Sequence, residues 1–277
     1  MMMIFYRYNG GNLMHSDYHN NIYYIDKGPY NGGHGYPAIF FIHDFLLDSK
    51  MFEAQILFFS NNYRTICIDI RGFGKSNQAN NARPAGLNEL VDDVIDIANH
   101  LNINKFVICG VSEGGYIALN TGYKYHSRVC GIILIGTSFH NKNKESVLKN
   151  IYYEKRNKLP DKKMIDLALK DISTERKENI ASWKKNLLSY DCDFIEKIHH
   201  IIYNDTNNKK IIKNITQPVL IVYGEHDPYF THYMIEDIQK NIKYPRIILI
   251  PEGKTFININ HSSSLNNIVK YWLNDYF

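Results

Sequence analysis

One serine of this sequence stands in a pattern that could make it a nucleophile. Ser112 lies in GVSEGG, whose G-x-S-x-G spacing follows the apolar run KFVIC and precedes a segment with helical periodicity. A sharp strand-to-helix turn would push the serine outward, and Gly110 and Gly114 would give the tight backbone room. The amide of Glu113 would open the helix and could donate to a developing oxyanion. The pattern therefore makes Ser112 a candidate nucleophile.

A serine nucleophile needs a base to take its proton and a carboxylate to orient that base. Asp227 is a carboxylate that follows the apolar run PVLIVYG. The segment IPEGKTFININH, residues 250–261, begins at the end of another apolar run, and its only histidine, His261, stands at its far end. The identity of the base is therefore the open question that these residues raise.

The elements that must hold these residues alternate along the chain. Continuous apolar runs indicate strands buried on both faces, and apolar spacings of three and four indicate amphipathic helices. We predict strands over 38–42, 65–70, 105–110, 129–136, 218–224 and 246–250. We predict helices over 48–59, 87–101, 114–125, 231–240 and at the C-terminal end. The alternation predicts an α/β fold with a mostly parallel central sheet flanked by helices, opened by an antiparallel pair over 4–8 and 22–26.

The alternation stops over residues 138–215, which are rich in Lys, Asn and Glu and contain no strand-like run. Apolar residues there recur at helical spacing, as around Trp183. A sheet that is interrupted by a helical block and then completed indicates one domain with a cap. We therefore divide the chain into an α/β core, 1–137 and 216–277, and a helical cap or lid, 138–215. Trp183 is expected to help line an apolar substrate pocket over Ser112.

Four motifs together resemble the α/β-hydrolase fold family over nearly the whole chain. They are IFFIHDF (39–45), DIRGFGKS (69–76), GVSEGG (110–115) and LIVYGEHDP (220–228). The resemblance implies that Ser112 is the nucleophile and Asp227 the acid of a catalytic triad. It also implies that the backbone amides of Phe45 and Glu113 are the oxyanion donors. The family's haloalkane dehalogenases and epoxide hydrolases use aspartate as nucleophile, so a serine leaves acyl transfer as the implied reaction.

The family's triad histidine is missing from its expected position. The family has a stretch like I-P-x-x-G-H-F after the last strand, and IPEGKTF matches it at Ile250, Pro251 and Phe256. Thr255 then takes the place of the histidine, 28 residues after Asp227. A threonine hydroxyl does not accept a proton near neutral pH, and loss of the base costs on the order of 10⁶ in kcat in a serine protease triad. An uncompensated site would be nearly inactive.

Two further residues bear on this site. His261 is the remaining candidate base, although Asn260 and Ser262 beside it favour a surface histidine at the start of a helix. Asp44 stands where the family usually has glycine, so its carboxylate could lie close to the oxyanion and to a bound substrate. Asp44 could also act as an alternative acid or base.

Two functions from different classes fit these residues. The first is a serine hydrolase that acts on a carboxylic ester or a related acyl bond, with a defective or rearranged triad. The second is a non-catalytic ligand-binding or interaction protein that keeps the pocket and has lost turnover. Ser112 and Asp227 favour the hydrolase. Thr255, Asp44 and Lys254, which takes the place of the glycine in I-P-x-x-G-H-F, favour the binding protein.

Composition and charge argue against several other classes. Net charge is +4, from 32 basic and 28 acidic residues spread along the chain, so no nucleic-acid partner is expected. The longest apolar runs are strand-length, which predicts no membrane span, and the N-terminal stretch does not resemble a secretory signal. The cysteines lack a metal-binding spacing, so we expect reduced thiols in a cytoplasmic protein with no metal and no cofactor; they are Cys67, Cys109, Cys130 and Cys192. The expected partner is a small acyl or ester molecule, and the sequence leaves the oligomeric state open.

Overall fold

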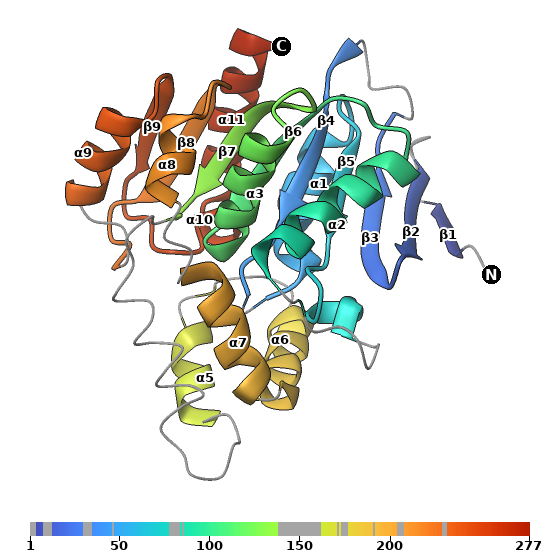
Figure 1. Cartoon of the computed structure of the whole chain (residues 1–277). Coiled ribbons are helices and arrows are strands. Elements are labelled where there is room, and N and C mark those ends of the chain that lie inside the picture. The colour runs from blue at the N-terminus through green and yellow to red at the C-terminus, as the bar shows by residue number, and fades with distance from the viewer. Residues whose placement is uncertain are drawn as a thin grey trace.

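The computed structural model describes the chain over 4–7, 13–29, 35–45, 47–77, 84, 86–137, 162–170, 172, 177–190, 192–203, 208–228 and 232–277. Within these residues the strands form one nine-stranded sheet in the order β1-β2-β3-β5-β4-β6-β7-β8-β9 (Figure 1). The strands are β1 (Ile4–Arg7), β2 (Leu13–His19), β3 (Ile22–Lys27), β4 (Ala38–Ile42), β5 (Thr65–Ile68), β6 (Phe106–Val111), β7 (Val129–Ile135), β8 (Val219–Gly224) and β9 (Pro245–Ile250). All pairs from β5/β4 to β8/β9 are parallel, whereas β1/β2, β2/β3 and β3/β5 are antiparallel.

The mostly parallel sheet predicted from the alternation is confirmed, but the predicted pairing at its beginning is wrong. β1 and β3 do not pair with each other, because β2 lies between them and pairs with both. The sequence of β2, LMHSDYH, is largely polar, so it lacks the apolar run that marks the other strands. Asn20 and Asn21, both at positive φ, turn the chain from β2 into β3.

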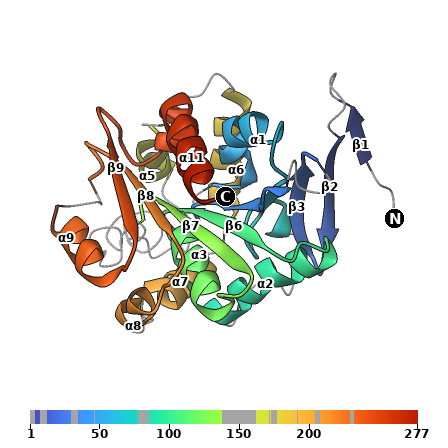
Figure 2. The same ribbon diagram turned by 90° about the horizontal axis from the view of Figure 1, so that it is seen from above.

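Helices cover both faces of the sheet, as Figure 2 shows. On one face lie α1 (Glu53–Phe59), α10 (Ile257–Asn260) and α11 (Ser262–Tyr276), which pack on one another. On the other face lie α2 (Leu87–His100), α3 (Glu113–Lys124) and α9 (His232–Asn241). Two 3₁₀ helices, η2 (Ser49–Phe52) and η3 (Gly74–Asn77), follow β4 and β5. Because the strands are parallel, the loops that follow them gather at one edge of the sheet, the carboxyl edge.

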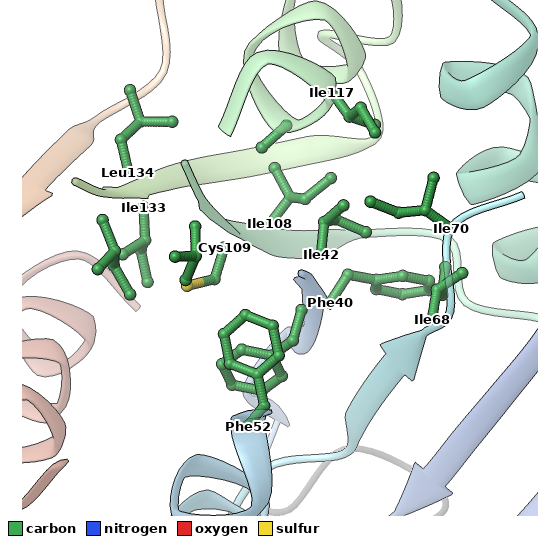
Figure 3. Close-up of a cluster of buried hydrophobic side chains, with 14 of the residues drawn as sticks. Phe40, Ile42, Phe52, Ile68, Ile70, Ile108, Cys109, Ile117, Ile133 and Leu134 are labelled. Atoms are coloured by element: carbon green, nitrogen blue, oxygen red, sulfur yellow. The ribbon is translucent and has the colours of Figure 1, made fainter. Parts of the chain in front are cut away.

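Apolar side chains from neighbouring strands form a continuous core. Every residue of β4 is buried, and Figure 3 shows Phe40 and Ile42 of this strand near Ile108 of β6 and Ile68 of β5. Strands that are covered on both faces have no polar alternation, which is why the sequence shows them as uninterrupted apolar runs. Burial of each such side chain stabilises the fold by about 1.5–3 kcal/mol. The core thereby fixes the strand ends from which the functional loops start.

Three helices between β7 and β8 lie together beyond one edge of the sheet (Figure 1); they are α5 (Lys162–Leu169), α6 (Lys177–Ser189) and α7 (Cys192–Tyr203). A fourth helix, α8 (Asn208–Lys213), packs instead on α3 and α9 of the core. Helices α5–α7 of the predicted range 138–215 therefore lie apart from α8, and we restrict the proposed cap to α5–α7. Residues 138–161 of that range lie outside the described residues. Within the described chain, no helix is both long enough and apolar enough to cross a membrane.

Candidate active site

Ser112 joins β6 to α3, and its backbone bends sharply there. It has φ 55° and ψ −115°, a combination that non-glycine residues rarely adopt and that costs on the order of 1–3 kcal/mol. The Ser112 amide donates to Ile135 O at 2.9 Å, and the Gly115 amide donates to Ser112 O at 3.0 Å. The first of these hydrogen bonds ties the bend to the end of β7. Backbone contacts thus hold the Ser112 bend, residues 110–115, at the carboxyl edge of the sheet.

Two glycines let the Ser112 bend pack against its neighbours. A Cβ added at Gly110 would lie 2.3 Å from Gly114 O, and one added at Gly114 would lie 2.3 Å from Ile42 O. These oxygens belong to the backbone of α3 and of the central strand β4 and cannot move away from such a contact, so both positions require glycine. The first turn of α3 therefore lies directly against the end of β4.

The hydroxyl of Ser112 is hydrogen-bonded to the side chain of the next residue. Ser112 Oγ donates to Glu113 Oε2 at 2.9 Å. Glu113 is the first residue of α3, and its side chain is buried, with 1% of the residue exposed. The sequence pattern indicated a role only for the backbone amide of Glu113. Its carboxylate was missed because the G-x-S-x-G pattern leaves the residue after the serine unspecified.

The peptide that links Asp44 to Phe45 is held by its carbonyl group. Asp44 O accepts hydrogen bonds from His43 Nδ1 at 2.7 Å and from the Leu47 amide at 3.0 Å. The Phe45 amide belongs to the same trans peptide and points the opposite way. In the described part of the chain, no acceptor is recorded for this amide, and the Phe45 ring stacks on Phe73 with centroids 4.9 Å apart. The role of the Phe45 amide as an oxyanion donor stays a prediction.

His43 is fully buried, and both of its ring nitrogens are engaged. Nε2 accepts a hydrogen bond from the Ile70 amide at 2.8 Å, so the ring proton is on Nδ1, which donates to Asp44 O. The imidazole is therefore neutral and ties the loop after β4 to the loop after β5. Because neither nitrogen is left to accept a proton from Ser112, His43 acts as a scaffold residue.

Asp227 and Thr255 meet where the turns after β8 and β9 pack together. Thr255 Oγ1 donates to Asp227 Oδ1 at 3.4 Å. The His226 amide donates to Gly253 O at 2.7 Å, and a Cβ added at Gly224 would lie 2.3 Å from the Gly253 carbonyl carbon. We call residues 224–228 the Asp227 turn. The structure thus brings the predicted acid together with the residue at the predicted histidine position.

One strand, β7, separates β6 with its Ser112 bend from β8 with its Asp227 turn. Neighbouring strands lie about 4.8 Å apart, so the backbones of β6 and β8 are roughly 10 Å apart. In a catalytic triad an imidazole spans such a gap, because its two nitrogens bond the serine and the acid at the same time. Thr255 has one short hydroxyl, which reaches Asp227 and is too weak a base for Ser112.

His261 lies at the junction of α10 and α11. Its amide donates to Ile257 O at 2.9 Å, and its carbonyl accepts from the Leu265 amide at 3.0 Å. Among the described residues, no hydrogen bond is recorded between the His261 imidazole and Ser112 or Asp227. The observed backbone bonds are those of a residue at the start of a helix, and a role of His261 as base stays a prediction.

Trp183 fastens the proposed cap to the core. Its indole Nε1 donates to Asp48 Oδ1 at 2.8 Å, and only 1% of the residue is exposed. Lys50 adds a second link, since its Nζ donates to Ser182 Oγ at 2.8 Å and lies 3.5 Å from Asp48 Oδ2. The partnership of Trp183 with Asp48 could not be found in the sequence, because 135 positions separate them. Contact of Trp183 with a substrate stays a prediction.

A second buried carboxylate, Asp69, supports the segment after β4 that contains Asp48 and Ser49. Its Oδ1 accepts from the Ser49 amide at 2.8 Å, and its Oδ2 accepts from the Lys75 amide at 2.8 Å. Burial and the nearby Asp48 carboxylate raise the pKa of Asp69 above its usual value. Burial likewise raises the pKa of the neighbouring Cys67 thiol, which keeps it protonated and makes it a poor alternative nucleophile.

A groove of about 770 Å³ lies between α1 and α11, and none of the predicted site residues lines it. Its walls include Leu57, Phe58 and Asn266. Ser112, by contrast, is 3% exposed, so the predicted site is covered in this structure. The chemistry of the residues, rather than the size of this groove, identifies the carboxyl edge as the candidate site.

The fold and the geometry of the site define a class of protein. A mostly parallel sheet covered on both faces, with a strained serine between a strand and a helix and an acid after a later strand, is the α/β-hydrolase fold. Comparison with known families agrees, since the family described as serine aminopeptidase, S33, matches residues 38–253. The chain belongs to this family of α/β hydrolases, which confirms the fold and the family resemblance expected from the four motifs.

Individual relatives are distant. Human serine hydrolase BPHL is 24% identical over 219 residues, which cover 76% of this chain and 69% of that protein. Epoxide hydrolase 3 of Xenopus tropicalis is 22% identical over 266 residues, covering 87% of this chain and 72% of its own. Over a shorter stretch of 108 residues, 3-oxoadipate enol-lactonase 1 of Acinetobacter baylyi is 34% identical and covers 39% of this chain and 40% of its own.

Two solved structures show the shared fold. The enol-lactonase of Burkholderia xenovorans superposes with a TM-score of 0.76 at 18% identity, covering 98% of this chain and 100% of that one. A thermophilic esterase of Thermogutta terrifontis superposes with a TM-score of 0.72 at 20% identity, covering 99% of each chain. At such identities the similarity extends to the fold and does not by itself assign a substrate.

Proposed function

We propose that this protein is a serine hydrolase that cleaves a carboxylic ester or a related acyl bond, with Ser112 as nucleophile. The observation that carries the proposal is the strained Ser112 bend, with φ 55° in a residue that is not glycine. Such strain persists only where the surrounding structure imposes it, and it concentrates at functional sites. A structural turn at this position would have no need of a serine with such a backbone.

The groups around the Ser112 bend support acyl transfer. Attack of Ser112 Oγ on an acyl carbon places negative charge on the carbonyl oxygen. The amides of Glu113 and Phe45 are the proposed donors to that oxygen, and the N-terminus of α3 favours negative charge at the same place. Asp44 in the adjoining loop and Trp183 of the cap are the proposed residues on the substrate side.

The relatives' names favour an ester-like bond. An enol-lactonase and an esterase are among the proteins that share the fold, and a lactone is a cyclic ester. Ser112 also fits a serine hydrolase such as human BPHL. We therefore propose a small acyl or ester substrate, no nucleic-acid partner and a cytoplasmic location. The free thiols of Cys67, Cys109 and Cys130 support that location.

A second function, that of a non-catalytic ligand-binding or interaction protein, is favoured by one specific observation. Thr255 stands beside Asp227 at 3.4 Å, where an imidazole would have to lie in an ordinary triad. A protein that had lost turnover could keep the fold, the bend and the acid while the base changed. The two functions differ in whether Ser112 reacts.

Reaction of the protein with a fluorophosphonate probe and with p-nitrophenyl acetate, beside Ser112→Ala, tests the proposal. We expect the wild type to be labelled and to hydrolyse the ester, and both signals to vanish in Ser112→Ala. The alanine variant should fold normally, because it removes one hydroxyl whose recorded partner is the adjacent Glu113. A wild type as inert as the variant would overturn the hydrolase and leave the binding protein.

A further inference from the structure

We infer that the carboxylate of Glu113 is the general base that takes the proton of Ser112. The inference rests on the proposed hydrolase function and supplies the group that Thr255 does not. Its geometric ground is the hydrogen bond from Ser112 Oγ to Glu113 Oε2 at 2.9 Å. This length lies within the roughly 2.6–3.2 Å over which a base can abstract a proton directly.

Three other groups, His43, Asp227 and His261, are less well placed to act as the base. Both nitrogens of His43 are engaged by backbone groups. Asp227 lies in the turn after β8, two strands from β6, at a backbone separation of roughly 10 Å. Within the described residues, no hydrogen bond of the His261 imidazole to Ser112 is recorded, whereas the Glu113 bond is already formed.

Charge movement in the reaction also favours Glu113. A buried carboxylate beside the oxyanion would be unfavourable if both carried a negative charge at once. Proton transfer from Ser112 makes Glu113 neutral at the moment when the oxyanion forms, so the site carries a single negative charge throughout. The N-terminus of α3 stabilises that charge in both places, since Glu113 is the first residue of this 12-residue helix.

Each step of the proposed reaction balances. Ser112 Oγ forms a bond to the acyl carbon, its proton moves to Glu113 Oε2, and the carbonyl π electrons move onto the carbonyl oxygen. When those electrons return, the bond to the leaving oxygen breaks and Glu113 gives the proton to that oxygen, which departs as an alcohol. In the second half a water oxygen attacks the acyl carbon while Glu113 takes a water proton. Glu113 then returns this proton to Ser112 Oγ as the acyl group leaves as a carboxylic acid.

The inference predicts a slow enzyme with a characteristic pH dependence. In model compounds a carboxylate is a weaker base than imidazole by about 2 pK units, so a lower rate than that of a histidine triad is expected. A base must be unprotonated to act, so kcat/KM should fall on the acidic side as the base is protonated. That acidic limb should belong to Glu113 and disappear when its carboxylate is removed.

Four variants test the inference against wild type over pH 4–9 with p-nitrophenyl acetate. Glu113→Gln keeps the size of the side chain, and we expect kcat/KM to fall by about 10²-fold or more, with loss of the acidic limb and little change in KM. Glu113→Gln/Thr255→His should regain activity with a new acidic limb near pH 6.5, the ordinary value of imidazole. Glu113→Ala should be rescued by added formate, which returns a carboxylate to the space. Glu89→Gln, which alters a first-turn carboxylate of α2 away from Ser112, is the matched control and should behave as wild type.

The outcomes separate this inference from the function on which it rests. Full or increased activity in Glu113→Gln, with Ser112→Ala inactive, would overturn the base assignment and keep the hydrolase. Loss of activity in Glu113→Ala without rescue by formate, with the pH profile of the residual activity unchanged, would show that Glu113 only positions Ser112. A wild type that neither labels nor turns over would overturn the hydrolase, and the base assignment with it.

Discussion

The Ser112 bend and the Asp227 turn lie at the same edge of the sheet, and both are packed so closely that only glycine fits at the contact. Gly114 touches the end of β4, and Gly224 touches the turn after β9. The two places differ in the side chains that meet there. At the Ser112 bend a hydroxyl meets a buried carboxylate at 2.9 Å, whereas at the Asp227 turn a carboxylate meets a hydroxyl at a long 3.4 Å. Backbone geometry has therefore been kept at both places, while the pairing suited to proton transfer exists at one.

Replacing either contact glycine by alanine tests whether the two places are equally rigid, and it carries the largest expected effect. An added Cβ would lie 2.3 Å from backbone atoms in both Gly114→Ala and Gly224→Ala. We expect each to lower the free energy of unfolding by about 3 kcal/mol, since overpacking against backbone is not relieved by rotamer changes. For Gly114→Ala this exceeds the gain of up to about 1 kcal/mol in helix propensity.

Urea denaturation measures this loss, with Gly86→Ser as the control. Gly86 caps α2 and has no heavy atom within 4 Å of an added Cβ, so serine should leave the stability unchanged or raise it slightly. If Gly224→Ala were tolerated and Gly114→Ala were not, the Asp227 turn would be less tightly packed than the Ser112 bend. The two places would then not share the same backbone rigidity.

Restoring the imidazole tests whether the Asp227 turn still has the geometry of a triad. We expect Thr255→His to raise kcat/KM for p-nitrophenyl acetate by about 10²-fold, equivalent to about 2.7 kcal/mol of barrier lowering. The gain should depend on Asp227, because that carboxylate would hold the new imidazole in the right tautomer.

Asp227→Asn provides the second arm of this experiment. In the Thr255→His background it should remove most of the gain, whereas in the wild type it should lower kcat/KM by less than about tenfold. An equal loss in the two backgrounds would mean that Asp227 works without an imidazole, and no gain in Thr255→His would mean that the assigned register is wrong.

These two places also show what a sequence can reveal. Strands β4 to β8 were predictable because they are buried on both faces and therefore appear as apolar runs, whereas the half-exposed β2 left no such run. The edge strand β9 is partly exposed and was still predicted from its apolar run RIILI. Ser112, Asp227 and Thr255 were predicted as site residues because the motifs that carry them are local and fixed in spacing. The Glu113 contact was missed because its side-chain direction depends on the bend. The link of Trp183 to Asp48 depends on how distant segments fold together.

The link between Trp183 and Asp48 extends the comparison to the cap, because it fastens α6 to the loop after β4, beside the Ser112 bend. Trp183→Phe keeps an aromatic ring but removes the N–H that reaches a buried carboxylate. We expect a loss of about 2 kcal/mol in the free energy of unfolding, typical for a hydrogen bond to a charged group. Lys185→Ala on the exposed side of α6 should change it by less than about 0.5 kcal/mol. Equal losses of stability in Trp183→Phe and Lys185→Ala would mean that any change in α6 is destabilising. The hydrogen bond to Asp48 would then not be what holds α6 in place.

The smallest effect is expected where the contact at the Asp227 turn is removed. Thr255→Val keeps the shape of the side chain and deletes the hydroxyl that meets Asp227 at 3.4 Å. A long and partly exposed hydrogen bond should contribute less than about 0.5 kcal/mol, and kcat/KM should change by less than about threefold. Thr65→Val is the matched comparison, since the Thr65 hydroxyl is fully buried and donates to Lys27 O at 2.8 Å, so its loss should cost about 1–2 kcal/mol. If Thr255→Val lowered the free energy of unfolding as much as Thr65→Val, Thr255 would be a structural partner of Asp227. It would then be wrong to describe Thr255 as the replacement of a lost base.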